Sequence, residues 1–442
     1  MLLAAAGPAA ASPRWPRPQR YDVDVRWDAG ARTLSGSERI AFLNAGPSTL
    51  SSVWLRVWPN GYGSCAHRYA HVSVAAGGKI AQTSVGCTAL RVRLGHPLAP
   101  GYAGAIRLQV RAVTPVKPNR FGFDAGIAYL GNALPVLAVE DAGGASIEPY
   151  TDLGDPFYSR SAAWSVRLSL ARGLTAASTG AVQRSSRIGH HRNRLRIFAG
   201  HARDFAFVIG RMSADVVRTG DGLRLVRYRP VRQARDDASR TSLDLARQAV
   251  DQYTAWYGSP GVKEIEIAPP PRSLGPFGAG MEFPGLVLAP EQPQFVAHEL
   301  AHQWFYSLVG NDQWRSPWLD ESFAEFSSRR LPESVVGGDD LGCDPRDPVG
   351  SKGEGPLTAS MKRWDAAGGG AYYNVVYLGG TCALRALEAD LGADWTTAFL
   401  RSFVAAHRWQ VVTSADFVSA LRSAVPAGYD VDGWLRRAEI EP

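Results

Sequence analysis

The chain has 442 residues, of which 45% are hydrophobic and 20% charged, and this composition predicts a globular protein of two or three domains. No run of 18 apolar residues occurs, so we expect no transmembrane segment. The net charge of +7 comes from arginine, because only five of the 48 basic residues are lysine. A basic cluster at residues 190–194 lacks interleaved aromatic residues. We therefore interpret it as a solvated strand end and expect no nucleic-acid partner.

The first 20 residues begin with small apolar residues and continue with prolines. They resemble the end of a secretory signal with a cleavage site near Ala11, although the usual basic start is missing. A misplaced start codon or a disordered terminus would give the same pattern. The number of cysteines is even and none has metal-binding spacing: Cys65, Cys87, Cys343 and Cys382. Cys65 and Cys87 are close enough in sequence to bridge neighbouring strands, but the pairing stays open. We expect a secreted or extracytoplasmic protein, with a cytoplasmic location as the alternative.

Residues 21–211 have the pattern of strands. Apolar and polar residues alternate in six stretches, at residues 21–27, 51–58, 90–94, 106–113, 164–170 and 195–197. Clusters of glycine, proline and asparagine separate them. The histidines of this part are scattered, so we interpret them as structural. We predict a leader at residues 1–20 and an N-terminal antiparallel β domain over residues 21–211.

The pattern changes after Gly210. Strands are expected at residues 223–228 and 264–268, with a helix at residues 238–257 between them. A loop rich in glycine, aspartate and proline at residues 337–355 leads to helices at residues 375–391, 394–407 and 414–424. We predict that residues 212–442 form a second domain, in which a small sheet precedes a mostly helical lobe. The fold class is therefore α+β.

The stretch at residues 295–326 carries the clearest chemistry. His298 and His302 stand four residues apart in an H-E-x-x-H pattern, so on a helix their imidazoles can point to one place. Zinc takes such nitrogen ligands at about 2.0–2.1 Å. Glu299 lies beside the metal without having to bind it, and it can accept a proton from water. The pattern predicts a zinc hydrolase.

A third zinc ligand is expected further along the chain, with eighteen residues between it and His302. The sequence at residues 310–312 indicates a helix stop and Pro317 a new helix start, so a second helix can deliver Glu321. Three protein ligands leave one position open, which is the catalytic arrangement and not the structural one. Glu325, four residues further on the same helical face, can accept the second N–H of His298 or His302. A solvated salt bridge is the alternative for Glu325.

Several motifs occur in an order that resembles the gluzincin aminopeptidases, the aminopeptidase N type that includes leukotriene hydrolase. In the second domain they are residues 280–285 (GMEFPG), 298–302 (HELAH), 318–321 (WLDE) and 377–380 (YLGG). In the first domain they are residues 130–132, 149–158 and 205–207. The resemblance covers nearly the whole chain. It implies a saddle-shaped β domain, then a thermolysin-like catalytic domain from about Met212, in a short bacterial-like member without the family's large C-terminal helical domain.

The resemblance also implies roles for individual residues. Glu299 would be the general base, and Tyr377 would donate a hydrogen bond to the oxyanion, with Tyr372 or Tyr373 as the fallback. Glu282 would bind the free α-amine of the substrate, because that amine has a pKa of about 7.7–8.0 and is mostly cationic at neutral pH. The substrate backbone would pair with a segment that contains Gly278, Ala279, Gly280 and Met281. A second amine-binding residue from the β domain stays open among Asn132, Glu140 and Asp141.

The motifs depart from the family pattern in three places. Asp320-Glu321-Ser322 replaces the usual Asn-Glu-Gly, a change that leaves the expected ligand, Glu321, in place. Phe283 replaces the commoner asparagine after Glu282, and Gly379 stands where a lysine often follows the tyrosine.

The resemblance implies a zinc aminopeptidase with one Zn²⁺ per chain, which acts on peptides with a free N-terminus. The alternatives are a non-catalytic zinc protein that captures peptides, and a zinc hydrolase of a non-peptide substrate such as an epoxide. The sequence leaves the oligomeric state open.

Overall fold

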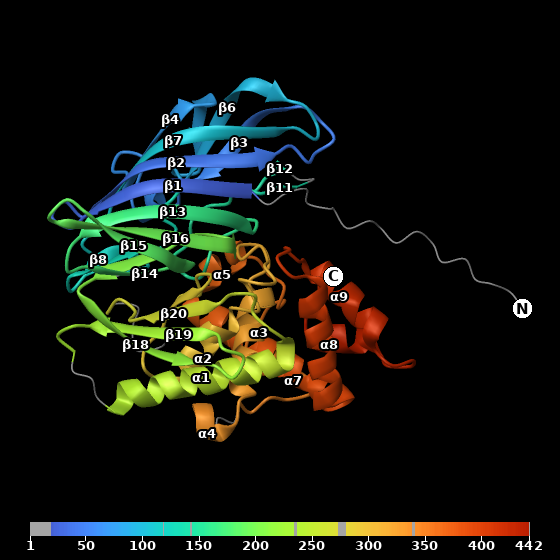
Figure 1. Cartoon of the computed structure of the whole chain (residues 1–442). Coiled ribbons are helices and arrows are strands. Elements are labelled where there is room, and N and C mark those ends of the chain that lie inside the picture. Colours follow the sequence, from blue (N-terminus) through green and yellow to red (C-terminus); the bar gives the residue numbers. More distant parts are fainter. Residues whose placement is uncertain are drawn as a thin grey trace, which may run out of the picture.

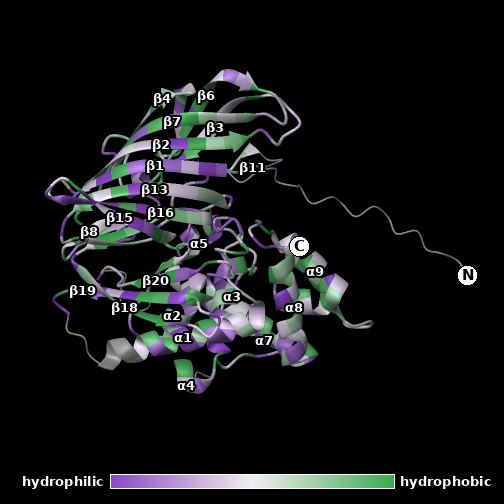
Figure 2. Cartoon of the chain, viewed as in Figure 1, coloured by the Kyte–Doolittle hydropathy of each residue, from purple (hydrophilic) through white to green (hydrophobic). Residues whose placement is uncertain are grey.

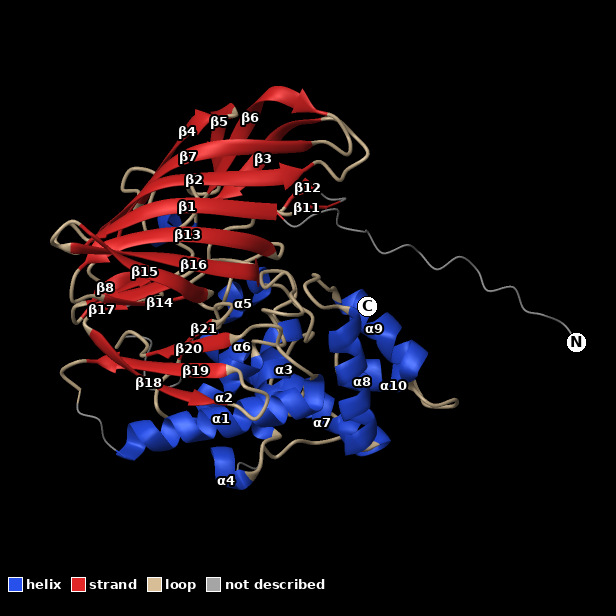
Figure 3. Ribbon diagram, viewed as in Figure 1, coloured by secondary structure: helices blue, strands red, loops and turns tan. Residues whose placement is uncertain are grey.

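The structure, a computed structural model, describes residues 19–117, 119–141, 144–233, 237–272, 280–337 and 341–441. It has an upper lobe of strands and a lower lobe in which helices pack beside a small sheet (Figures 1 and 3). The predicted leader at residues 1–20 lies outside the described residues up to residue 18. No helix in the described ranges is both long and apolar enough to cross a membrane.

The upper lobe is built on a seven-stranded sheet. Its strands, in spatial order, are β15 (Ala181–Ile188), β16 (Arg192–Ala202), β13 (Ala162–Ala171), β1 (Gln19–Asp28), β2 (Thr33–Leu43), β7 (Ala103–Val113) and β4 (Ala70–Ala76). Hydrophobic and hydrophilic residues alternate along these strands (Figure 2), as expected when one face is buried and the other solvated. In β1, for example, Tyr21, Val23, Val25 and Trp27 are buried.

Smaller sheets complete this lobe. One contains β10 (Val136–Leu137), β3 (Leu50–Arg56), β6 (Ala89–Leu98) and β5 (Gly78–Ser84), and another contains β14 (Thr175–Ser178), β17 (Phe207–Gly210), β9 (Ile127–Leu130) and β8 (Phe121–Asp124). A short pair is formed by β11 (Glu140–Asp141) and β12 (Gly144–Ala145). The strand expected at residues 51–58 ends at Arg56, because the chain turns into a 3₁₀ helix, Trp58–Tyr62, with Pro59 in its first turn.

The prediction of an antiparallel β domain is confirmed for the lobe as a whole, but one central pair is parallel. β1 pairs with β13 in parallel register from Gln19 and Ala162 onward. Parallel neighbours need a long crossover, and here the chain builds most of the other strands of the lobe before it returns beside β1. Alternation within each strand cannot reveal this direction.

The lower lobe has a four-stranded sheet, and helices pack on the face of this sheet that is turned away from the upper lobe. The strands are β18 (Met212–Arg218), β19 (Arg224–Pro230), β20 (Glu264–Ala268) and β21 (Leu286–Leu288). The helices are α1 (Asp237–Tyr257), α2 (Pro293–Ala301), α3 (Trp318–Arg329), α4 (Glu333–Val336), α5 (Met361–Ala367), α6 (Gly369–Tyr372), a π-helix (Tyr373–Gly379), α7 (Gly380–Leu391), α8 (Ala393–Ala406), α9 (Ser414–Ala424) and α10 (Val431–Arg437). The α+β prediction is confirmed. We propose the domain boundary at residues 211 and 212, between β17 and β18.

The two lobes are joined by buried polar contacts and by a shared apolar cluster. The buried Arg203 guanidinium of the upper lobe donates to the Tyr306 carbonyl at 2.6 Å and also to the Gln410 carbonyl, both in the lower lobe. Glu266 of β20 accepts a 2.6 Å bond from the backbone N–H of Ser178 in β14. A hydrophobic cluster at the boundary contains residues of both lobes, among them Phe157 and Phe283. The lobes therefore form one packed unit.

All four cysteines form disulfides. Cys65 pairs with Cys87 and Cys343 with Cys382, with 5.4 Å between the Cα atoms in each pair. Cys65 and Cys87 lie in loops next to strands and not in the strands themselves. The second pair ties the loop that follows α4 to α7.

Candidate active site

Helix α2 carries the first two candidate ligands. Pro293 stands in its first turn, where the missing N–H costs nothing. The helix ends at Ala301, so the expected stop at residues 310–312 is wrong. The reason lies in the loop that follows: Tyr306 has φ of 133°, which no helix allows, and its carbonyl binds Arg203. His298 and His302 still converge, with 3.2 Å between their Nε2 atoms.

Helix α3 supplies the third candidate ligand. It begins at Trp318 directly after Pro317, as predicted, and its first turn places Glu321 next to both imidazoles. Glu321 Oε2 lies 3.2 Å from His298 Nε2 and 3.4 Å from His302 Nε2. Ligands at about 2.0–2.1 Å in a tetrahedron are separated by about 3.3 Å. The three side chains, all buried, are therefore spaced as a zinc ion requires.

The electrostatics of this group fit a cation. Burial opposes charge on Glu321, but its contacts with His298 and His302 outweigh it and hold the pKa of Glu321 well below its usual range. Burial lowers the pKa of His302, but the contact with Glu321 raises it more, to about 9. The site thus favours positive charge between its three donors. A bound zinc ion supplies that charge without protons.

Both histidines are held through their other nitrogen. His298 Nδ1 lies 2.8 Å from Glu325 Oε2, while Glu325 Oε1 accepts from Arg329 Nε at 2.5 Å. His302 Nδ1 lies 3.0 Å from the carbonyl oxygen of Phe305. A carbonyl only accepts, so His302 Nδ1 must carry the proton and Nε2 is left free for a metal.

Glu299 faces the same space from α2. Its Oε2 atom is buried and has no hydrogen-bond partner among the described residues, and burial raises the pKa of Glu299 to about 7. The backbone of Gly280 lies against it: a Cβ at Gly280 would come within 1.9 Å of Glu299 Oε1. Glycine is thus required at this point of residues 280–285. Gly278 and Ala279 lie outside the described residues.

Met281 and Glu282 follow on the same segment. Met281 forms a bridge with Leu288, and its sulfur lies 3.7 Å from Arg120 of the upper lobe. Glu282 is buried, and burial raises its pKa to about 8. Gln313 donates to Glu282 Oε1 at 2.6 Å. Gln313 was not predicted from the sequence, where a glutamine in a loop between two helices gives no signal.

The tyrosines lie where the chain passes from α6 into α7. Tyr377 sits in the π-helix, a form often found at functional sites. Its ring stacks on His298, with 5.6 Å between the ring centroids, and it donates a hydrogen bond to Glu321. Tyr372 is buried beside Tyr377 and next to Gly154 of the upper lobe, where a Cβ would come within 2.9 Å of the phenol oxygen. Tyr373 is 43% exposed.

Two departures from the family pattern are matched by glycines. The Ser322 hydroxyl donates to the Val376 carbonyl of the π-helix at 2.7 Å. It occupies the space next to Gly380, where a Cβ would come within 2.0 Å of the hydroxyl oxygen. The Phe283 ring packs in the same way on Gly131, where a Cβ would come within 2.5 Å of the ring. The larger side chains thus fit because glycines face them.

The three candidates for a second amine-binding residue lie in different places. Asn132 follows Gly131, is buried, has φ of 50°, and has an Oδ1 atom without a hydrogen-bond partner in the described part of the chain. Glu140 and Asp141 form the exposed strand β11, and Asp141 pairs with Arg315 at 3.4 Å. Through the contact between Gly131 and Phe283, only Asn132 is tied to the segment that carries Glu282.

Comparison with known proteins gives consistent matches. The model of the peptidase family M1 domain matches residues 290–435. Among curated proteins, the tricorn protease-interacting factor F2 of Thermoplasma volcanium is 24% identical over 232 residues, which are 46% of this chain and 29% of that protein. Aminopeptidase N of Lactobacillus delbrueckii subsp. lactis is 34% identical over 139 residues, 27% of this chain and 16% of that protein. The chain thus matches less than a third of the length of these relatives.

A solved structure matches over almost the full length. The M1 zinc metallopeptidase of Deinococcus radiodurans has a TM-score of 0.68 and 21% identity, and the alignment covers 96% of this chain and 95% of that one. At this identity the match shows the shared two-lobe fold. The family model spans both the H-E-x-x-H helix and Glu321, and together with the shared fold it supports the resemblance of this chain to the gluzincin aminopeptidases of peptidase family M1.

Proposed function

We propose that this chain is a zinc-dependent aminopeptidase that hydrolyses the N-terminal peptide bond of peptides, with one zinc ion per chain. The observation that carries the proposal is the convergence of His298, His302 and Glu321 at the spacing of a zinc ion, with Glu299 beside them. The matches to aminopeptidases in Lactobacillus and to a peptide-bound member of the fold, an M1 metallopeptidase with Tyr-Ser-Ala, support it.

In this proposal His298, His302 and Glu321 hold the metal, which when bound supplies Lewis acidity toward water and the peptide carbonyl. Glu299 removes the proton from the attacking water as general base and passes it to the leaving amine. Its buried position next to Gly280 keeps its free oxygen directed at the reacting atoms. Glu325 orients His298 by accepting its second N–H.

Tyr377 is the proposed donor to the oxyanion. Burial raises the pKa of Tyr377 well above that of a free phenol, so the hydroxyl keeps its proton at neutral pH and can donate a hydrogen bond to a developing negative charge. The stacking on His298 and the hydrogen bond to Glu321 hold its hydroxyl next to the ligands. Tyr372, buried behind it, supports the ring of Tyr377.

Glu282 gives the proposed enzyme its preference for a free N-terminus. A buried carboxylate gains most from a cationic amine and loses most when an uncharged internal peptide leaves it without a partner. We propose Asn132 as the second amine-binding residue, because its position beside the Phe283 segment favours it over the exposed Glu140 and Asp141. The backbone of Gly278, Ala279, Gly280 and Met281 would pair with the substrate.

The two disulfides support the proposal that the protein works in an oxidising, extracytoplasmic compartment, since disulfides are rare in the cytosol.

The test is hydrolysis of a panel of aminoacyl chromogenic amides, each with and without N-acetylation, before and after chelation and with zinc returned. We expect cleavage of the free-amine substrates only, loss on chelation and recovery with zinc. Cleavage of the acetylated substrates would contradict the role of Glu282. One bound zinc without turnover of any amide would point to peptide capture, and turnover of a lipid epoxide alone would point to a non-peptide hydrolase.

A further inference from the structure

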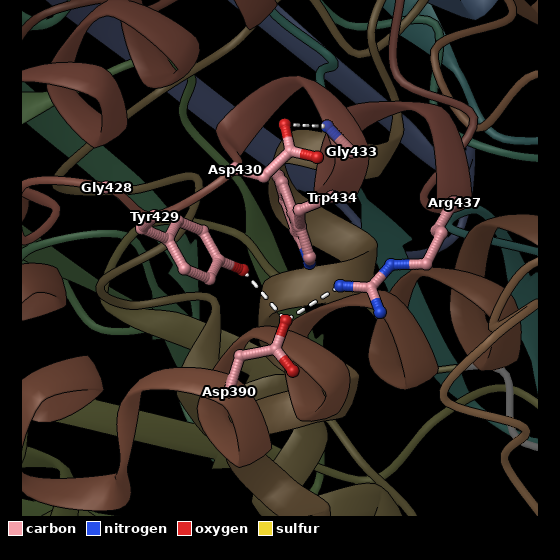
Figure 4. A pocket seen from close by; sticks show the side chains of 7 residues that line it. All are labelled: Asp390, Gly428, Tyr429, Asp430, Gly433, Trp434 and Arg437. Atoms are coloured by element: carbon pink, nitrogen blue, oxygen red, sulfur yellow. Dashed lines mark hydrogen bonds and ion pairs between the residues drawn. The ribbon is translucent and has the colours of Figure 1, made fainter.

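Outside the site, a surface cavity of about 540 Å³ lies between α7 and α10 (Figure 4). Its charged groups already pair with each other: Asp390 accepts from Tyr429 at 2.9 Å and from Arg437 at 2.7 Å. Nothing there requires a ligand. The polar contacts of Gln313, within the candidate site, support a further inference.

Gln313 lies in the loop between α2 and α3 and is buried. Its side-chain nitrogen donates to Glu282 Oε1 at 2.6 Å and to Asp320 Oδ2 at 2.8 Å. An amide nitrogen has two hydrogens, so one NH₂ group serves both carboxyl groups. The orientation of the amide is determined, because the opposite orientation would place its oxygen against two carboxyl oxygens.

From this geometry we infer that Gln313 positions Glu282 for the α-amine of the substrate; the inference rests on the proposed aminopeptidase function. Gln313 occupies one oxygen of Glu282 and leaves the other, Oε2, for the amine. Without this bond the carboxylate could rotate about its side-chain torsions. A hydrogen bond to a charged group also stabilises the ionised form that the amine requires.

The second bond of Gln313 fixes where the amine is held relative to the metal ligands. Asp320 directly precedes Glu321, and its Oδ1 accepts the backbone N–H of Glu321 at 3.0 Å. The backbone N–H of Gln313 is held by the Phe157 carbonyl of the upper lobe at 3.3 Å. Gln313 therefore sets the separation between the amine anchor and the ligand helix. That separation decides which peptide bond of the substrate lies at the metal.

Asp320 is part of this arrangement. Where the family usually has asparagine, a carboxylate here offers an acceptor that the Gln313 NH₂ group uses. An asparagine side chain at this position would present either a donor or an acceptor, whereas the aspartate presents only acceptors. Asp320 thus fixes the orientation of the Gln313 amide.

The experiment compares Gln313→Met, which keeps the length of the side chain but removes the donor, with Asn311→Leu. Asn311 is an equally buried amide in the same loop, and within the described part of the chain its nitrogen bonds to the Ser316 carbonyl alone, at 3.0 Å. KM and kcat are measured for aminoacyl amides and for des-amino amides with the same side chain. Affinity for L-arginine and L-leucine and for their des-amino analogues is measured by calorimetry on the zinc-loaded proteins, and zinc content is measured on each.

We expect Gln313→Met to raise KM for free-amine substrates by about ten- to a hundredfold, the value of a hydrogen bond to a charged group, and to weaken amino-acid binding by the same factor. Cleavage of the des-amino amides and zinc content should not change, and Asn311→Leu should keep the preference for the amine. Gln313→Asn, which is too short to reach both carboxyl groups, should give the same result if Gln313→Met does not fold.

Equal losses for free-amine and des-amino compounds, or an unchanged preference in Gln313→Met, would overturn this inference alone. A wild-type protein that neither binds amino acids nor distinguishes them from des-amino analogues would overturn the proposed function, and this inference with it.

Discussion

The contact between Ser322 and Gly380 allows a quantitative test of how the site is built. Ser322 holds the Val376 carbonyl of the π-helix, one residue before Tyr377, and its side chain fills the space above Gly380. A Cβ at Gly380 would come within 2.0 Å of the Ser322 hydroxyl oxygen, whereas the next neighbour outside Ser322, Leu357 Cδ1, would lie 3.3 Å away. Removal of the serine side chain should therefore make room for the methyl group.

The two single substitutions should both destabilise the lower lobe. Ser322→Gly leaves a buried carbonyl without its donor, which costs about 1–3 kcal/mol. Gly380→Ala gains about 1 kcal/mol in helix propensity but is overpacked by about 1–3 kcal/mol, because the serine side chain cannot retreat. With Ser322→Gly already present, the overpacking disappears, and Gly380→Ala should be neutral or stabilise by about 1 kcal/mol.

The measurement is thermal unfolding of the wild type, the two single variants and the double variant. A coupling of about 2 kcal/mol corresponds to about 4–8 °C for a lobe of this size. Additive shifts in the melting temperature would refute the reasoning, because they would mean that the two side chains do not compete for one space. In the same variants, kcat should fall when Ser322 is replaced and should stay the same when only Gly380 is replaced. The reason is that the Ser322 hydroxyl, and no group of Gly380, holds the π-helix that carries Tyr377.

Three further predictions concern other groups. Glu299→Gln should retain zinc but lower kcat by about 10²–10⁴, measured by steady-state kinetics and metal analysis; an unchanged kcat would place the general base elsewhere. Burial raises the pKa of Glu38 in β2 well above its unfolded value. Stability should therefore fall by about 1.4 kcal/mol per pH unit as the pH rises from its unfolded pKa through its folded pKa, and urea unfolding of Glu38→Gln should lack this loss. Replacement of both Cys343 and Cys382 by serine opens a loop of 39 residues and should lower stability by about 4 kcal/mol in urea unfolding; no change would argue against this pair.

The sequence revealed the parts of the site that depend on local spacing. His298, Glu299 and His302 lie within two helical turns, and Pro317 marks the start of the helix that carries Glu321. The structure retains the expected directions of these side chains, because a helix fixes them without help from the rest of the chain. The strands of the upper lobe were visible for the same reason, since alternation is a local property.

Features set by distant residues were not predictable. The end of α2 depends on Tyr306, whose carbonyl is held by Arg203 from the other lobe, a hundred positions earlier in the chain. Gln313 carries no pattern because its partners, Glu282 and Asp320, meet it only in the folded chain. Sequence spacing thus predicts the candidate ligands of the site but not the contacts that hold them.

Those distant contacts make the upper lobe a part of the site. Arg120 and Asp155, both from this lobe, form a buried ion pair, and Arg120 also donates to the Gly154 carbonyl at 3.1 Å. Burial raises the pKa of Asp155 to about 8, while Arg120 opposes the shift and Glu282 adds to it. The carboxyl groups of Asp155 and Glu282 thus interact electrostatically across the lobe boundary. A change at Arg120 should therefore alter the electrostatics around Glu282 without moving any of the candidate metal ligands, because Arg120 interacts with Glu282 across the lobe boundary but contacts none of the three ligand side chains directly.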